Sequence, residues 1–354
     1  MKISTEEYDY SISNYDNYEE IANYTGAQVL NVKLRGETDL LFINNLVDRE
    51  DQKMDWNRYH KYEDIIAFLN YLSISYPNIT EVKVLGKSHE EREIRLFRLS
   101  NGNSSNKAVF IESGIHAREW ISVATVTYII NELTTHFDDE SDDIRNIDWY
   151  FVPIINPDGY YHTHKSTGGD RLWRKNRRHT TGSCFGVDLN RNFGYGWITK
   201  KNHGIDNCKE DYAGPHAFSE AETIAIHDFI LNSAINFTAY LSYHSYGQFI
   251  LYPYGYNQTN IDNYKELHDI AEGMAEVYKA VGYRYHVGNS AKMLYPASGL
   301  SNDWAASIGI EHPFVIELSD TGFNGFLLPS KYIIKVANSS LAALKELAAY
   351  IINK

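Results

Sequence analysis

One segment of this sequence places a histidine and a glutamate where both could bind the same metal ion. His116 and Glu119 are three residues apart in the segment 114–120, which follows a predicted strand and opens a predicted helix. Imidazole and carboxylate groups are common zinc ligands. A single His-x-x-Glu pair is weak evidence, however, because the chain contains 14 His and 46 acidic residues. The pair by itself is therefore only a candidate metal site.

Three other segments that are predicted to be strands also end in residues that could do chemistry. These are His244 in the strand 237–244, Glu317 in the strand 314–318, and Asn190-Arg191 after the segment 186–189, which contains Asp188. In open α/β sheets, sites form beyond the carboxyl ends of strands. Taken singly, His244 would more often be a core histidine and Glu317 a paired carboxylate. Taken together with His116 and Glu119, they favour a hydrolytic zinc site.

The elements that must position these residues alternate along most of the chain. Apolar runs predict strands, and apolar residues at helical spacing predict helices. The predicted strands include 82–85, 94–99, 108–112 and 149–155, and the predicted helices include 120–137, 264–281 and 330–352. A turn is expected at 156–159, Asn-Pro-Asp-Gly. This alternation predicts an α/β fold with one central, twisted, mixed parallel and antiparallel sheet that is flanked by helices on both faces.

Composition excludes several classes of protein. The 354 residues are 43% hydrophobic and 22% charged, which is typical of a folded globular chain. No apolar run approaches the ~18–20 residues that span a bilayer, so no membrane partner is expected. The net charge of −13 argues against a nucleic-acid partner. The basic stretch 171–179 could be a nucleic-acid patch, but the acidic background disfavours that interpretation.

The N-terminus and the two cysteines leave the cellular compartment open. Residues 1–50 are polar and acidic, and no apolar segment follows Met1 as it would in a signal peptide. Either the protein is intracellular or the sequence lacks its true start. The spacing of Cys184 and Cys208 fits two free thiols as well as one disulfide, which would indicate an oxidising compartment.

Several motifs, in their order along the chain, resemble those of the pancreatic-type zinc metallocarboxypeptidases, the carboxypeptidase A/B family. The resemblance runs from about Trp56 to the C-terminus. The motifs are His116-Ala-Arg-Glu-Trp120, Asn156-Pro-Asp-Gly-Tyr160, Leu172-Trp-Arg-Lys-Asn-Arg177, Asp188-Leu-Asn-Arg-Asn192, His244-Ser-Tyr246, Leu251-Tyr-Pro-Tyr-Gly255 and Phe326-Leu-Leu-Pro329. The combination is highly specific, and it implies an exopeptidase that hydrolyses the C-terminal peptide bond of peptides and proteins.

The resemblance also implies a role for each residue that matches a family motif. His116, Glu119 and His244 would bind one Zn²⁺ per chain, and Asp188 would hydrogen-bond a zinc-binding histidine from outside. Glu317 would be the general base, and Arg174 would stabilise the oxyanion. The groups that would hold the substrate carboxylate are Asn190, Arg191 and Tyr295. The residues that would line the neighbouring subsites are Arg118, Tyr246 and Phe326.

One family position selects the C-terminal residue of the substrate: it is aliphatic in A-type enzymes and acidic in B-type enzymes, which release Lys or Arg. That position is Asn302 here. The neighbouring pocket positions are Ser242, Gly255, Ser290, Ala297, Leu300 and Val315. The pocket is thus expected to be neutral, with an amide at its base and apolar walls. Release of apolar, aromatic or uncharged polar residues is predicted, and a B-type enzyme is the alternative.

The resemblance further implies a secreted, monomeric zymogen in which Cys184 and Cys208 form a disulfide. Residues 23–47 resemble only the beginning of the family's inhibitory pro-domain. The expected organisation is therefore an N-terminal polar segment, residues 1–50, which is an incomplete pro-segment, followed by the catalytic domain, residues 51–354. A catalytically silent peptide-binding protein on the same fold is the rival hypothesis. A cytosolic relative that acts on acidic protein tails is disfavoured by the cysteine pair and the neutral pocket.

Overall fold

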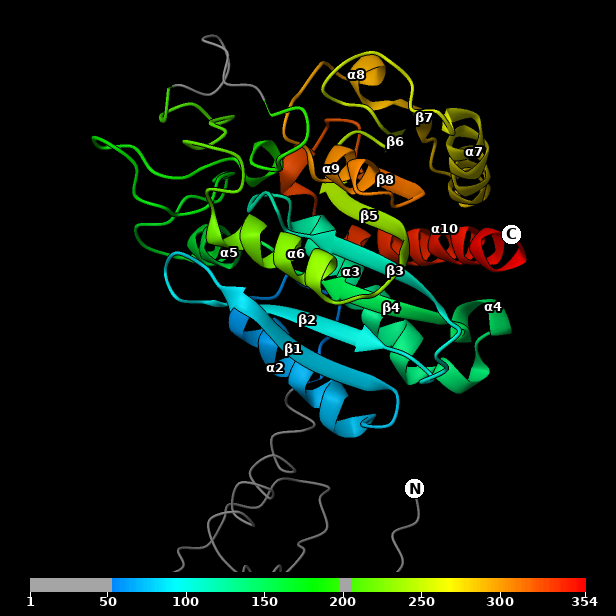
Figure 1. The fold of residues 1–354 in the computed structure, drawn as a ribbon. Coiled ribbons are helices and arrows are strands. Elements are labelled where there is room, and N and C mark those ends of the chain that lie inside the picture. Colours follow the sequence, from blue (N-terminus) through cyan, green and yellow to red (C-terminus); the bar gives the residue numbers. More distant parts are fainter. Residues whose placement is uncertain (1–52, 198–205) are drawn as a thin grey trace, which may run out of the picture. The chain divides into compact units, whose positions relative to one another are not determined.

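The computed structural model describes residues 53–197 and 206–354 (Figure 1). The predicted N-terminal segment, residues 1–50, lies outside this part of the chain. The strands are β1 Thr80–Lys87, β2 Glu93–Leu99, β3 Lys107–Ser113, β4 Ile147–Val152, β5 Phe237–Ser245, β6 Phe249–Tyr252, β7 His286–Asn289 and β8 His312–Leu318. The α-helices are α2 Tyr62–Ser75, α3 Trp120–Thr135, α4 Asp142–Arg145, α5 Pro157–His164, α6 Ala221–Asn232, α7 Tyr264–Ala280, α8 Ser290–Met293, α9 Ser301–Ser307 and α10 Ile333–Asn353.

The eight strands form one mixed sheet in the order β1-β2-β4-β3-β5-β8-β6-β7. Strands β4, β3, β5 and β8 run parallel to one another at the centre of the sheet. Antiparallel pairs join β1 to β2, β2 to β4 and β6 to β8. The carboxyl ends of the central strands therefore meet at one edge, where ligands bind in open α/β sheets.

Both faces of the sheet are apolar, and each face is covered by its own set of helices. Along β3, Val109 and Ile111 belong to one buried cluster, whereas Ala108 and Phe110 belong to the other. The first cluster includes side chains of α2, α3, α7 and α10, and the second includes side chains of α6 and α9. Successive strand residues point to opposite faces, so the predicted sheet with helices on both sides is confirmed. No helix in the described ranges is both long and apolar enough to cross a membrane.

One predicted strand was wrong. The segment 186–189 contains no strand; instead a short 3₁₀ helix covers Leu189–Arg191. The Asp188 carboxylate accepts a hydrogen bond from the Asn190 backbone N–H at 3.0 Å, which caps this turn. The Asp188 backbone N–H donates to the Tyr212 carbonyl, which joins the turn to a later segment of the same chain.

Cys184 and Cys208 form a disulfide, with their Cα atoms 5.1 Å apart. The bond closes a loop with a sequence separation of 24 residues, and this loop contains Asp188, Asn190 and Arg191. The disulfide that the family resemblance implied is therefore present in the structure, and it restrains a segment that carries several candidate site residues.

Opening this disulfide is expected to lower the stability of the fold. A loop of this length restricts the unfolded chain by about 3 kcal/mol, so the Cys184→Ser/Cys208→Ser double variant should lose roughly that amount of its free energy of unfolding. Denaturant titration of both proteins, with and without a reductant, measures the loss. A reductant should destabilise the wild type but not the variant. Equal stability of the four samples would contradict the prediction.

Candidate active site

The segment that carries His116 and Glu119 connects β3 to α3 through a tight turn. Gly114 opens the turn with a φ of +63°, and a Cβ at this position would lie 2.9 Å from the Val123 side chain. Glu119 directly precedes α3, and its backbone carbonyl accepts a hydrogen bond from the Ser122 hydroxyl at 2.7 Å. The turn therefore sets the direction of both candidate ligands.

Asn156 holds this segment against the chain that carries Arg174. Its amide nitrogen donates to the backbone carbonyls of Ile115 at 3.2 Å and Lys175 at 3.0 Å. The Ala117 backbone N–H also donates directly to the Arg174 carbonyl at 3.0 Å. The sequence pattern predicted only a turn at Asn156, since the partners of this side chain are backbone groups that are distant along the chain. The structure identifies it as a positioning residue.

His244 and Glu317 lie side by side on two parallel strands. They are register partners near the carboxyl ends of β5 and β8. The Ser245 backbone N–H donates to Glu119 Oε2 at 3.1 Å, so the end of β5 also fixes the Glu119 carboxylate. The central strands thus bring His116, Glu119, His244 and Glu317 to one edge of the sheet, as the strand ends predicted.

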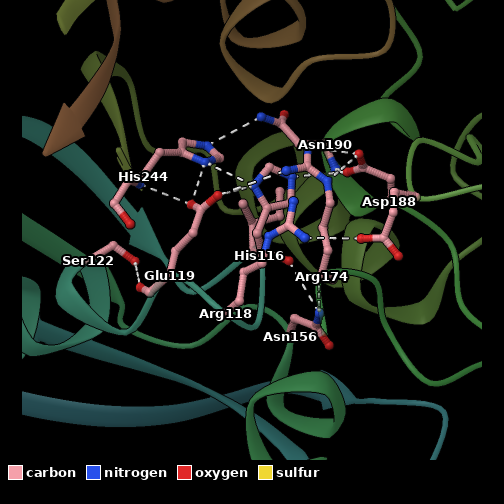
Figure 2. A network of polar contacts seen from close by, with 12 residues as sticks. His116, Arg118, Glu119, Ser122, Asn156, Arg174, Asp188, Asn190 and His244 are labelled. Carbon is pink, nitrogen blue, oxygen red and sulfur yellow. Dashed lines mark hydrogen bonds and ion pairs between the residues drawn. The ribbon is translucent and has the colours of Figure 1, made fainter. Parts of the chain in front are cut away.

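His116, Glu119 and His244 converge closely enough to share one cation (Figure 2). His116 Nδ1 lies 2.8 Å from Glu119 Oε1, His244 Nδ1 lies 3.0 Å from Glu119 Oε2, and the two Nδ1 atoms are 3.2 Å apart. All three residues are buried. Two imidazole nitrogens this close to each other and to a carboxylate fit a bound divalent cation. The donor set of two nitrogens and one carboxylate matches zinc.

Asp188 and Arg174 are not candidate metal ligands themselves, but they hold the candidate ligand His116 in place. Asp188 Oδ1 lies 3.0 Å from His116 Nε2, which fixes the orientation of that imidazole. Arg174 Nε donates to Asp188 Oδ2 at 2.9 Å. Burial alone would raise the pKa of Asp188, but the charge of Arg174 reverses this effect and holds it well below its ordinary value. Burial lowers the pKa of His116 and so favours the neutral imidazole that can bind a metal.

Glu317 lies on the wall of the cavity that contains these ligands, and it is not one of them. Burial raises its pKa to about 7, since the loss of hydration outweighs the attraction of His244. Glu317 therefore lies where a general base would act on a molecule in the cavity, without being one of the candidate metal ligands.

Arg191 presents a guanidinium group to the same cavity. Arg191 Nη1 donates to the backbone carbonyl of the preceding residue, Asn190, at 2.7 Å. Arg191 Nη2 donates to the Tyr295 hydroxyl at 3.3 Å. Within the described ranges no acidic side chain forms an ion pair with Arg191. The Asn190 amide is fixed by contacts with His244 at 3.2 Å and the Ser301 backbone N–H at 2.9 Å. Arg191 is therefore able to bind a carboxylate from outside the protein.

The cavity has a volume of about 320 Å³ and is lined by most of the predicted site residues. Those that line it are His116, Glu119, Arg174, Asn190, Arg191, His244, Tyr246, Tyr295, Glu317 and Phe326. Asp188 lies behind His116 and does not line the cavity. Arg118 also lies outside the lining; its guanidinium stacks over the Phe326 ring, 4.3 Å from the ring centroid. The Phe326 ring in turn packs edge-on against Tyr246.

The predicted specificity pocket is only partly as expected. Of its predicted members, the cavity is lined by Ser290, Ala297, Leu300 and Val315, to which the structure adds Leu251 and Leu294. Asn302, the predicted base, is fully buried and does not line the cavity, and neither do Ser242 and Gly255. Position in a motif predicted which segment forms the pocket. Within that segment Ala297 and Leu300 line the cavity as expected, whereas Asn302 does not.

A family model described as zinc carboxypeptidase matches residues 65–343. The chain belongs to this family. Carboxypeptidase B of Astacus astacus is 39% identical over 302 residues, which cover 84% of this chain and 98% of that protein. The structure of carboxypeptidase A from Helicoverpa armigera shares 34% identity with a TM-score of 0.78, over 90% of this chain and 81% of that one.

The structure of bovine thrombin-activatable fibrinolysis inhibitor in complex with tick carboxypeptidase inhibitor shares 33% identity and a TM-score of 0.79, over 84% of this chain and 99% of that one. The protein is therefore a metallocarboxypeptidase, and this fold binds peptide C-termini as substrates. A zinc ion held by three protein ligands acts as a Lewis acid and makes water a nucleophile at neutral pH. Both A-type and B-type relatives match this chain, so the preferred C-terminal residue must be inferred from the pocket.

Proposed function

We propose that this zinc carboxypeptidase releases neutral C-terminal residues. The observation that carries the proposal is the uncharged part of the cavity lining, formed by Leu251, Ser290, Leu294, Ala297 and Val315. A Lys or Arg side chain placed there would lose hydration without gaining a carboxylate partner. An apolar side chain would instead gain free energy from burial.

Asp303 is the nearest acidic residue in sequence to the predicted specificity position, and it is already engaged. Its carboxylate accepts the backbone N–H groups of Gly255 at 2.8 Å and Tyr256 at 2.9 Å. It is fully buried and does not line the cavity. Asp303 therefore supports the backbone around the pocket and is not a partner for a cationic substrate.

In the proposed reaction, each of the other residues that line the cavity has a separate role. Arg191 and Tyr295 bind the terminal carboxylate, which restricts hydrolysis to the last peptide bond of a chain. Glu317 takes a proton from the attacking water and later returns it to the leaving amine. Arg174 donates hydrogen bonds to the oxyanion that forms at the scissile carbonyl. A catalytically silent binding protein, the rival hypothesis, would not need a general base and an oxyanion donor beside the candidate metal ligands.

A panel of peptides that differ only in the last residue tests the preference. We expect kcat/KM for Leu, Phe or Gln to exceed that for Lys or Arg by about a hundredfold or more, because an unpaired buried cation costs several kcal/mol and each ~1.4 kcal/mol is a factor of ten. The same peptides with a C-terminal amide should be resistant, since Arg191 would lose its partner. Fastest release of Lys and Arg would overturn the proposal and favour the B-type activity for which the Astacus astacus relative is named.

Metal content separates an active enzyme from a silent binding protein. We expect one zinc ion per chain by elemental analysis, loss of activity in a chelator, and recovery when zinc is restored. Protein that contains no zinc and has no chelator-sensitive activity would support the silent alternative.

We also propose that the protein is secreted, acts as a monomer and carries an incomplete pro-segment in residues 1–50. The disulfide between Cys184 and Cys208 supports secretion, since disulfides persist in oxidising compartments. Non-reducing peptide mapping of protein from its native source tests this point. Two free thiols in that protein would contradict it.

A further inference from the structure

Two residues of one short segment, Leu300 and Asn302, differ in whether their side chains reach the specificity pocket. Leu300 lines the cavity, whereas Asn302 is fully buried and does not. Leu300 directly precedes α9, and Asn302 lies in its first turn. Which of the two side chains meets the substrate decides how large and how polar that substrate's last side chain can be.

Leu300 reaches into the pocket because the facing residue has no side chain. A Cβ on Gly255 would overlap Leu300 Cδ1, so the leucine fills space that any other residue at position 255 would occupy. The same hypothetical Cβ would contact the Ser290 side chain at 3.4 Å. Ser290 also lines the cavity, so the space that Leu300 fills is continuous with the pocket wall.

Behind this wall lie buried polar groups without protein partners. Neither amide atom of Asn302 has a hydrogen-bond partner among the described residues, and the Ser242 hydroxyl, which faces the Glu112 carboxylate, has no hydrogen bond of good geometry there. Ser242 is the register partner of Val315, which lines the pocket. Asn302 is joined to the same region by its neighbour Ser301, whose backbone N–H donates to Asn190 Oδ1 at 2.9 Å. Unpaired polar groups therefore lie next to the pocket but outside its lining.

We propose that Leu300 is a specificity-determining residue that closes the pocket in front of Asn302. This inference rests on the proposed release of neutral residues, and it restricts the range of C-terminal side chains that the enzyme accepts. The closed pocket accepts small and medium-sized aliphatic side chains in preference to aromatic ones. It also keeps the Asn302 amide from contact with a polar substrate side chain.

The decisive experiment replaces Leu300 with glycine. Leu300 has extended backbone angles, φ −80° and ψ 146°, at the N-cap of α9, and glycine is well tolerated at this position of a helix. Wild type and Leu300→Gly are compared on peptides that end in Val, Leu, Phe or Gln. We expect the kcat/KM ratio of Phe to Val to rise about tenfold or more, the range that pocket size controls. The Gln to Leu ratio should rise as well.

A double variant tests the role of Asn302. In Leu300→Gly/Asn302→Leu, the gain for Phe should remain and the gain for Gln should disappear. Leu231→Ala, an exposed leucine of α6, is the matched control and should leave all ratios unchanged. Leu300→Ala should give a smaller shift in the same direction, which keeps the test valid if the glycine variant is unstable.

The possible outcomes separate this inference from the proposed function. Unchanged Phe to Val ratios in both Leu300 variants overturn the inference, even if neutral residues remain the preferred products. Fastest release of Lys and Arg by the wild type overturns the proposed function, whereas a shifted Phe to Val ratio in Leu300→Gly would still support the role of Leu300 in pocket size. If the Gln to Leu ratio of kcat/KM stays raised in Leu300→Gly/Asn302→Leu, the Asn302 amide does not contact the substrate, and the role proposed for it is overturned.

Discussion

Glu317→Gln is expected to lower kcat for a good peptide substrate by a factor of about 10²–10⁴, the usual contribution of a general base. The amide has nearly the same shape as the carboxylate but cannot take a proton from water. Glu317 lies on the cavity wall beside His244 and is outside the group formed by His116, Glu119 and His244. The variant should therefore keep its zinc and bind substrate with a similar KM.

Steady-state kinetics and metal analysis on the same preparations check this prediction. Glu311→Gln is a suitable control, since Glu311 is an exposed carboxylate just before the same strand, and its replacement should leave kcat unchanged. Loss of zinc from Glu317→Gln would show that the residue acts on the metal site. A kcat within a few-fold of the wild type would remove Glu317 from the role of general base.

The sequence was sufficient for the central strands of the sheet and for the residues at their carboxyl ends, but it did not predict strands β6 and β7. Strands β3 and β5 contribute to both buried clusters and β8 to one of them, so their apolar runs stand out and their carboxyl ends can be located to within a residue or two. Because parallel strands end at one edge, His116, His244 and Glu317 could be placed together without knowledge of their distances.

The segment around Asp188 shows where such reasoning fails. The segment Gly186-Val187-Asp188-Leu189 resembles the end of a strand, yet no strand forms there. The conformation is set by the Asp188 side chain, which caps its own turn, and by contacts with distant backbone groups. Asn302 shows a second limit. Its side chain is fully buried and does not line the cavity, whereas Leu300, two residues earlier, does, and the sequence pattern does not distinguish the two.

Arg174→Ala is expected to lower kcat by about 10²–10³, since one lost oxyanion donor typically costs roughly 3–4 kcal/mol of transition-state stabilisation. The oxyanion forms only as the carbonyl is attacked, so KM should change little. Arg174 lines the cavity near the candidate zinc ligands, with Nη1 3.9 Å from Glu119 Oε1. Unchanged kcat/KM on a good peptide substrate would contradict this role.

The same change has a structural effect that must be measured separately. Asp188 is fully buried and pairs with Arg174 at 2.9 Å, so removing the arginine leaves a buried carboxylate without its cationic partner. Breaking such a pair costs about 3–5 kcal/mol of stability. Arg174→Lys is the matched control, because it restores a positive charge near Asp188 but lacks the planar fork that can donate to two acceptors at once. We expect the lysine variant to recover most of the lost stability and zinc affinity while kcat stays low. If stability and kcat instead recover together, Arg174 acts mainly by holding Asp188 and His116 in place, and the oxyanion must be stabilised by other groups.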